Sequence, residues 1–261
     1  MPKVQANGIE LYYETQGAGQ PLVLIHGLGS STNDWEFQVP EFSKRYQVIA
    51  FDLRGHGKSD KPAGPYTIPM FAQDAADLLK ALGIASAHIV GISLGGGVAF
   101  QFALDHPGMV KTLTIVNSGP TMVAPGGDAK KEIDSRIAIV QQLGMRAMGQ
   151  ALAPRLFPKP EQASLRESFI EHWAENDSRA YVDALLSMVD WNVINQISSI
   201  QAPTLVISSD QDYSPVSLKE AYVKLMPNAV LVVIADARHA VTMEQPQALN
   251  AELEKFLAKH G

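Results

Sequence analysis

The chain contains 261 residues, of which 46% are hydrophobic and 18% are charged, and its formal net charge is -6. This composition excludes an intrinsically disordered protein. The excess of acidic residues argues against nucleic acid or an anionic membrane surface as the main partner. Because the sequence has no cysteine, it also excludes disulfides, thiolate nucleophiles and Cys-ligated metals.

The N-terminal residues lack the apolar segment and the cleavage site of a signal peptide, and apolar runs elsewhere are shorter than a membrane span. We therefore expect a cytoplasmic protein that binds neither membranes nor nucleic acids. A chain of this length fits one domain with a substantial insertion. The sequence leaves the oligomeric state open.

The first half of the chain alternates between predicted strands and helices. The dipeptide Asn7-Gly8 is typical of a two-residue turn and predicts an N-terminal hairpin. Apolar runs predict strands over residues 4–6, 9–15, 22–25, 48–51, 88–90 and 110–116. We expect helices over residues 33–42 with Thr32 or Asn33 as the cap, over 69–82, and from Ser93 to about His106.

The alternation stops after Asn117 and resumes at Thr204. The later elements predicted are strands over residues 204–208 and 230–234 and helices over 218–225 and 246–259. Strands that alternate with helices are typical of an α/β fold, in which a mostly parallel central sheet has helices on both faces.

The segment between these halves has no strand pattern. It contains amphipathic helical pieces interrupted by Pro154 and Pro158. We therefore predict an α/β core formed by residues 1–119 and 201–261, with a helical cap, residues 120–200, inserted in it.

The most informative motif is the stretch from His88 to Gly97, in which a predicted strand runs through Gly-x-Ser-x-Gly into a predicted helix. This order is typical of a nucleophile elbow, a sharp turn that presents a reactive serine, here Ser93. Side chains two residues before and after the serine would collide with neighbouring backbone, and Gly91 and Gly95 remove them. The amide of Leu94 then opens the helix beside Ser93, where negative charge would form during acyl transfer.

A serine hydroxyl needs a general base, and the base needs an orienting acid. His239 follows the last predicted strand, at the sheet edge where parallel sheets place their sites, so we expect it to be the base. The loop after the preceding strand offers two aspartates. We favour Asp212 as the acid, with Asp210 as the alternative, and we assign Asp236 to the turn before His239.

A second oxyanion donor is expected from the loop His26-Gly27-Leu28-Gly29, which follows an apolar strand. Glycines on both sides of Leu28 allow its backbone amide to approach a ligand closely. We expect His26 itself to form structural hydrogen bonds.

Taken together, these motifs resemble the α/β-hydrolase superfamily, in the branch with a small helical cap. The resemblance extends to Asp52-x-Arg54-Gly55-His56-Gly57-x-Ser59 and to Glu244-x-Pro246. It implies that Ser93 is the nucleophile, Asp212 the acid and His239 the base, with Leu28 and Leu94 as oxyanion amides. Members of the family usually place a glycine three residues before the acid, whereas this chain has Ser209 there, which keeps Asp210 as the alternative.

The resemblance implies a serine hydrolase of the carboxylesterase or enol-lactonase type, with a small ester or lactone and water as its partners and without a metal or organic cofactor. Serine at the elbow separates the chain from dehalogenases and epoxide hydrolases, which have aspartate there. Two alternatives retain the same three residues: a carbon–carbon bond hydrolase and a cofactor-free perhydrolase. A small-molecule-sensing signalling protein with a retained triad is an alternative of another class.

The predicted cap is rich in apolar residues, most of which we expect to pack its helices together. We nevertheless predict that some form an apolar substrate pocket above Ser93, and name Met122, Met145, Met148 and Trp191. We expect three cap arginines to be solvated at the surface: Arg136, Arg146 and Arg155.

Overall fold

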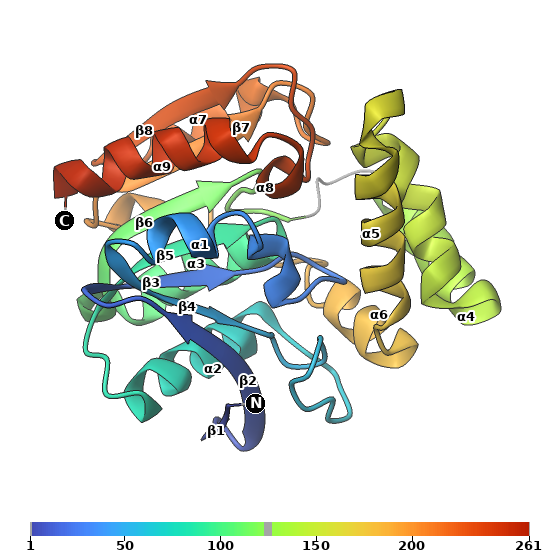
Figure 1. Ribbon diagram of the computed structural model, residues 1–261, viewed down its shortest axis with the longest axis horizontal. Coiled ribbons are helices and arrows are strands. Elements are labelled where there is room, and N and C mark those ends of the chain that lie inside the picture. Colours follow the sequence, from blue (N-terminus) through green and yellow to red (C-terminus); the bar gives the residue numbers. More distant parts are fainter. Residues whose placement is uncertain (1, 123–126, 261) are drawn as a thin grey trace.

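The computed structural model describes residues 2–122 and 127–260. The described residues form an eight-stranded sheet with the strand order β1-β2-β4-β3-β5-β6-β7-β8 (Figure 1). The first two strands are antiparallel to their neighbours and the remaining pairs are parallel. The strands are β1 (Lys3–Ala6), β2 (Ile9–Gln16), β3 (Gln20–Ile25), β4 (Tyr46–Phe51), β5 (Ala87–Ile92), β6 (Val110–Val116), β7 (Thr204–Ser209) and β8 (Ala229–Ile234).

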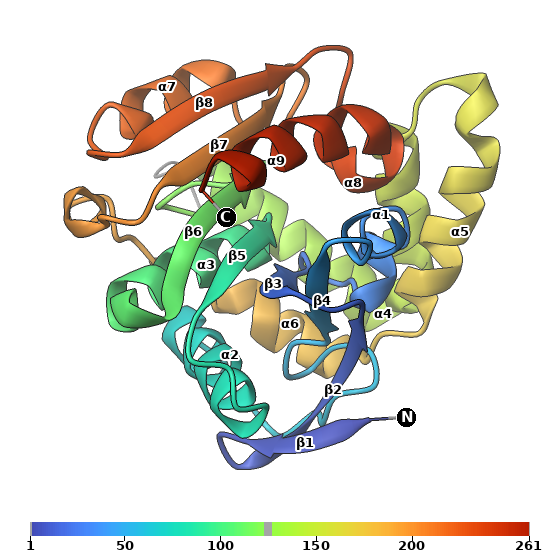
Figure 2. The same cartoon turned by 60° about the vertical axis from the view of Figure 1, so that its left-hand side comes forward.

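Helices cover both faces of this sheet, as the sequence predicts for an α/β fold (Figure 1, Figure 2). The helices of the sheet region are α1 (Val39–Phe42), α2 (Ile68–Ala81), α3 (Leu94–Asp105), α7 (Val216–Val223), α8 (Val241–Glu244) and α9 (Pro246–His260). Three-residue or four-residue 3-10 turns lie at Thr32–Trp35, Pro107–Met109, Pro160–Gln162 and Ile197–Ser199.

Two apolar cores follow from the alternation of side chains along the strands. Val23 on β3 belongs to the core that also contains Val98 of α3, whereas the next residue, Leu24, belongs to the core that contains Leu253 of α9. Because each central strand is buried on both faces, its sequence is almost continuously apolar. The carboxyl ends of the strands remain as the edge at which loops gather.

Among the described residues between β6 and β7, three α-helices follow one another: α4 (Gly127–Leu156), α5 (Ala163–Ala174) and α6 (Ser178–Leu186). They pack on one another at one side of the sheet, on the right in Figure 1. The two ends of this segment are joined by a bridge between Thr121 and Asn192 and by a 2.8 Å hydrogen bond from the Val193 amide to the Pro120 carbonyl. The division of the chain into a core and a cap stays a prediction.

Two local expectations were wrong. The single helix expected over residues 33–42 is two short elements, because Pro40 has no amide proton and is tolerated only in the first turn of α1. The cap is Ser31, whose hydroxyl accepts from the Asn33 amide at 3.3 Å. The break expected at Pro154 instead occurs at Gly144 (φ 81°, ψ 177°), a conformation that glycine adopts readily, and α4 continues through Pro154.

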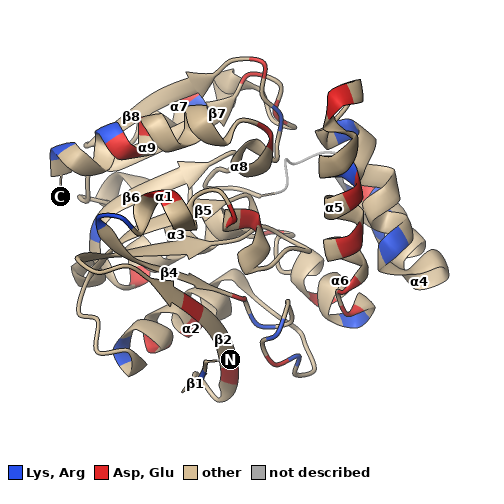
Figure 3. Ribbon diagram, in the orientation of Figure 1, with Lys and Arg blue, Asp and Glu red and all other residues tan. Residues whose placement is uncertain are grey.

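Acidic and basic residues are interspersed over the described ribbon, and helices α5 and α9 each carry both signs (Figure 3). Across residues 2–122 and 127–260, no helix combines the length and hydropathy that a membrane crossing requires.

Candidate active site

Ser93 occupies a strained turn between β5 and α3. Its backbone has φ 54° and ψ -120°, a conformation that residues other than glycine rarely adopt. The Ser93 amide donates a hydrogen bond to the Val116 carbonyl of β6 at 3.0 Å. A Cβ atom on Gly91 would lie 2.1 Å from the Gly95 carbonyl oxygen, and one on Gly95 would lie 2.1 Å from the Ile25 carbonyl oxygen. The two glycines of the motif are therefore required by the close approach of three chain segments.

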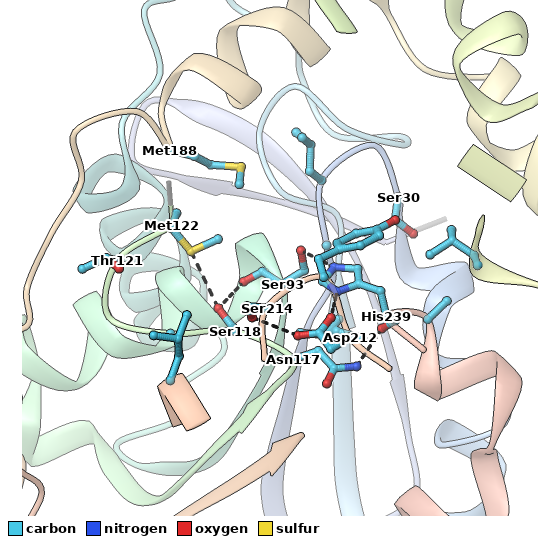
Figure 4. A pocket seen from close by; sticks show the side chains of 18 of the residues that line it. Ser30, Ser93, Asn117, Ser118, Thr121, Met122, Met188, Asp212, Ser214 and His239 are labelled. Carbon is cyan, nitrogen blue, oxygen red and sulfur yellow. Dashed lines mark hydrogen bonds and ion pairs between the residues drawn. The ribbon is translucent and has the colours of Figure 1, made fainter. Parts of the chain in front are cut away.

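His239 and Asp212 lie in line with Ser93 (Figure 4). The Nε2 atom of His239 is 2.9 Å from the Ser93 hydroxyl oxygen, and its Nδ1 atom is 2.5 Å from Oδ1 of Asp212. A proton on Nδ1 that is donated to Asp212 leaves Nε2 as an acceptor for the serine proton. This arrangement of hydroxyl, imidazole and carboxylate can perform nucleophilic catalysis.

The structure separates the two candidate aspartates. Asp212 faces His239, whereas Asp210 accepts hydrogen bonds from the Asp236 and Ala237 amides at 3.0 and 3.1 Å. Asp236 has φ 53° and belongs to the turn before His239. Asp210 therefore stabilises the loop that carries His239, and its carboxylate is directed at backbone amides.

The carboxylate of Asp212 is almost fully buried, with 1% of the side chain exposed. Burial opposes its ionisation, but the hydrogen bond and charge of His239, together with Lys219, lower the pKa of Asp212 to about 2. The Lys219 ammonium lies 2.6 Å from Oδ2 of Asp212 and is itself 1% exposed. Asp212 therefore remains ionised at any pH at which the protein would work.

The two amides predicted as oxyanion donors flank Ser93. Leu94 is the first residue of α3, so its amide has no acceptor within the helix. Leu28 lies in the loop after β3, and a Cβ atom on the adjacent Gly27 would be 3.4 Å from Cβ of Ser93. Both Leu28 and Ser93 line the same cavity. The oxyanion role of these amides stays a prediction.

Two residues that the sequence did not indicate contact the base. Asn117, at the end of β6, donates to the His239 carbonyl at 2.9 Å and accepts from the Ser209 amide at 2.7 Å. The Tyr213 ring stacks on the His239 imidazole with 4.2 Å between the ring centroids. Both follow strands at the edge that holds the site, and that position was the available signal.

Hydrogen bonds connect the loop after β4 to the loop after β3, which carries Leu28. Asp52 accepts from the Thr32 and Lys58 amides, each at 2.7 Å, and His26 accepts from the Leu53 amide at 3.0 Å. Burial lowers the pKa of His26 to about 4 and that of His56 to about 3, so both imidazoles are neutral inside the fold. His26 thus forms the structural hydrogen bonds expected of it.

A cavity of about 660 Å³ opens above Ser93 and is lined mainly by apolar side chains. Its walls come partly from the sheet region, such as Ile92 and Met243, and partly from the 120–200 segment, such as Phe169, Trp173 and Met188. A cavity of this size and composition suits a small, partly apolar molecule.

Of the four residues predicted to form the pocket, Met122 lines this cavity and the other three do not. Met145 and Met148 are 4% and 2% exposed and belong to the apolar core. The Trp191 indole donates to Gln101 of α3 at 2.9 Å. The apolar pattern indicated packing residues in this segment, but it could not show which of them adjoin the cavity.

The expectation that Arg136 is solvated at the surface was wrong, because it lines the cavity with 17% of its side chain exposed. Its Nε atom lies 3.0 Å from Glu132, which also pairs with Arg155 at 3.5 Å. Burial opposes the ionisation of Glu132, but these two arginines lower its pKa. Arg146 forms an exposed ion pair with Glu171.

Within the described part of the chain, no cluster of three or more His, Asp or Glu side chains is arranged to hold a metal ion.

Comparison with known proteins gives a consistent result. The model of the family described as "alpha/beta hydrolase fold" matches residues 20–142. A protein assigned as carbamate hydrolase RutD, from Caulobacter segnis, is 31% identical over 260 residues, which cover 94% of this chain and 95% of that protein.

Solved structures agree over the whole chain. The enol-lactonase from Burkholderia xenovorans LB400 superposes with a TM-score of 0.91 at 26% identity, covering 98% of this chain and 100% of the other. A thermophilic esterase from Thermogutta terrifontis gives a TM-score of 0.91 at 28% identity and covers 100% of both chains.

Proposed function

The chain belongs to the α/β-hydrolase fold family and is a hydrolase, and from that premise we propose that it cleaves a small, partly apolar carboxylic ester or lactone through an acyl-enzyme on Ser93. The observation that carries the proposal is the 2.9 Å contact between the Ser93 hydroxyl and Nε2 of His239, with Asp212 behind the ring.

In the first half of the reaction, Ser93 Oγ attacks the ester carbonyl carbon while His239 Nε2 takes the hydroxyl proton. The Leu28 and Leu94 amides stabilise the resulting oxyanion. The carbon–oxygen bond to the alcohol then breaks, and His239 gives its proton to the leaving oxygen. A lactone would follow the same step, with the alcohol remaining attached to the acyl group.

In the second half, a water molecule attacks the acyl carbonyl carbon and His239 takes its proton. The bond to Ser93 Oγ breaks, the proton returns to Ser93, and the carboxylic acid is released. Asp212 accepts the hydrogen bond from His239 Nδ1–H throughout, stays ionised and stabilises the imidazolium that forms in each half.

The cavity supports a partly apolar substrate, because Ile92, Met188 and Met243 line it together with Ser93. Three relatives are named for three substrate classes: a lactone for the Burkholderia enzyme, an ester for the Thermogutta enzyme and a carbamate for the Caulobacter protein. A panel of p-nitrophenyl esters, lactones, carbamates and vinylogous diketones, with and without peroxide, tests these classes together with the carbon–carbon hydrolase and perhydrolase alternatives.

The decisive variant is Ser93→Ala. We expect it to lose turnover of every substrate and to resist labelling by an organophosphate, whereas Ser217→Ala, at an exposed serine of α7, should retain both. Undiminished hydrolysis by Ser93→Ala would refute the proposal. Tight ligand binding by the wild type without turnover of any panel member would instead favour the sensing protein.

A further inference from the structure

Lys219 of α7 is a buried lysine beside the candidate triad. Its side chain is 1% exposed, and lysine is rarely buried unless its charge is paired. The ammonium lies 2.6 Å from Asp212 Oδ2, 2.7 Å from the Ser214 carbonyl oxygen and 2.5 Å from the Ser214 hydroxyl. These three partners match the three protons of an ammonium group.

The ammonium and the imidazole bind opposite oxygens of one carboxylate. His239 Nδ1 contacts Oδ1 of Asp212, and Lys219 contacts Oδ2. A carboxylate behind the imidazole favours the protonated ring, whereas a nearby positive charge opposes it. The two charges on Asp212 and Lys219 therefore act on His239 in opposite directions.

We propose that Lys219 is a positioning residue for the reaction inferred above, on which this inference rests: it fixes the Asp212 carboxylate behind the imidazole, and its ammonium offsets part of the carboxylate charge that acts on His239. The Ser214 hydroxyl also lies 3.1 Å from Asp212 Oδ2, so Lys219, Ser214 and Asp212 form a closed set of contacts. This set fixes the carboxylate from the side opposite the imidazole.

Other charged or titratable groups also act on His239 and Asp212. Asp34, from the turn after β3, lines the cavity and interacts electrostatically with His239. Tyr213 stacks on the imidazole and is approached by Arg136 and Arg155, and Tyr222 of α7 interacts with Asp212. All of these groups remain when Lys219 alone is changed, so a difference between Lys219 variants reports on Lys219.

The test replaces Lys219 by Met and by Arg, with Lys224→Met as the matched control. Lys224 is exposed at the end of the same helix, and its replacement changes the net charge by the same amount. The first readout is the titration of the His239 imidazole, which NMR of histidine-labelled protein measures. It is made in the Ser93→Ala background and needs no substrate. The second is the pH profile of kcat/KM.

We expect Lys219→Met to raise the pKa of His239 by about one unit. On the acid limb, where protonated His239 is inactive, kcat/KM should then fall about tenfold relative to its plateau. Lys219→Arg should restore the wild-type profile in large part, and Lys224→Met should leave it unchanged. Lys219→Gln, which keeps two donors for Asp212 and Ser214, replaces the methionine variant if that variant does not fold.

A folded Lys219→Met protein whose His239 titrates as in the wild type would overturn the inference, even if its thermal stability and its activity at all pH values were lower. A shifted titration together with absence of hydrolysis in the wild type would uphold the electrostatic role and refute the proposed function. The acid limb of the kcat/KM profile could also report the titration of Asp34. In that case Asp34→Asn would remove the limb, while the NMR titration of His239 would not move by a matching amount.

Discussion

The side-chain amide of Asn117 donates to the backbone carbonyl of His239 at 2.9 Å. A residue at the end of β6 thus holds the loop that follows β8. Asn117 also donates to the Ser209 hydroxyl and accepts from the Ser209 amide, and it adopts φ 45°, which asparagine tolerates better than most residues. One side chain connects the ends of three strands at the site.

Replacing Asn117 by Ala should lower kcat by about 10- to 100-fold, because the imidazole loses its fixed position relative to Ser93. It should also lower the free energy of unfolding by about 1–3 kcal/mol, since buried backbone groups lose their partners. Ester hydrolysis and denaturant unfolding measure the two effects. Asn228→Ala, which removes a similar hydrogen bond to the exposed Gln201 carbonyl, serves as the control and should keep the wild-type kcat.

Gly95→Ala should destabilise the protein by at least about 3 kcal/mol, because its Cβ would lie 2.1 Å from the Ile25 carbonyl oxygen. Gly108→Ala is the matched control. Nothing lies within 4 Å of a Cβ at Gly108, so this change should alter stability by less than about 0.5 kcal/mol. Thermal unfolding of both variants compares them, and similar midpoints would contradict the elbow geometry described for Ser93.

The pH dependence of stability should reflect the buried histidines. The pKa of His56 is about 3 in the fold against 6.5 for an ordinary histidine, so the unfolded chain binds the proton more readily. The stabilising effect is complete above pH 6.5 and is lost as the pH falls toward 3, at about 1.4 kcal/mol per pH unit for this histidine. His26, with a pKa of about 4, acts in the same direction.

His56→Leu should therefore show a shallower loss of unfolding free energy between pH 6.5 and pH 4 than the wild type. Urea unfolding at several pH values measures this slope. His260→Leu, at an exposed histidine, should leave the slope unchanged. Equal slopes for the wild type and His56→Leu would show that folding does not change the proton affinity of His56.

Variants of two methionines should distinguish an effect on substrate selectivity from an effect on stability. Met188 lines the cavity, so Met188→Ala should raise kcat/KM for bulky esters relative to acetate esters by about tenfold. Met148 is buried but lies outside the cavity wall, so Met148→Ala should lower stability by about 2–5 kcal/mol and leave this ratio unchanged. Kinetics with an acyl-chain series and thermal unfolding test both expectations. An unchanged ratio in Met188→Ala contradicts the first, and altered selectivity in Met148→Ala contradicts the second.

The fold could be predicted because its signals are local. Apolar runs marked each strand of the parallel sheet, and Gly91, Ser93 and Gly95 marked the elbow within five consecutive residues. His239 and Asp212 could be found because chain order and strand ends restrict the choice. Asp210 remained an alternative since both aspartates occupy the same loop, and only the hydrogen bonds to the Asp236 and Ala237 amides distinguish it.

The remaining features depend on contacts between distant segments. Nothing near Lys219 in the sequence shows that its ammonium is buried, because a lysine on a short helix is ordinarily solvated. The same reason applies to Arg136, whose neighbours Tyr181 and Tyr213 lie more than 40 positions away, on α6 and in the loop after β7. Met145 and Met148 satisfy the helical pattern as well as any cavity residue would, but they belong to the apolar core and do not line the cavity.

Ser93 and His239 are 146 positions apart, and His239 follows β8 at the edge of the described sheet. Contacts between such distant positions form slowly compared with helices, whose contacts are local. Recovery of catalysis during refolding should therefore lag behind the circular dichroism signal of the helices. Turnover can thus serve as a kinetic marker for the docking of the C-terminal strand.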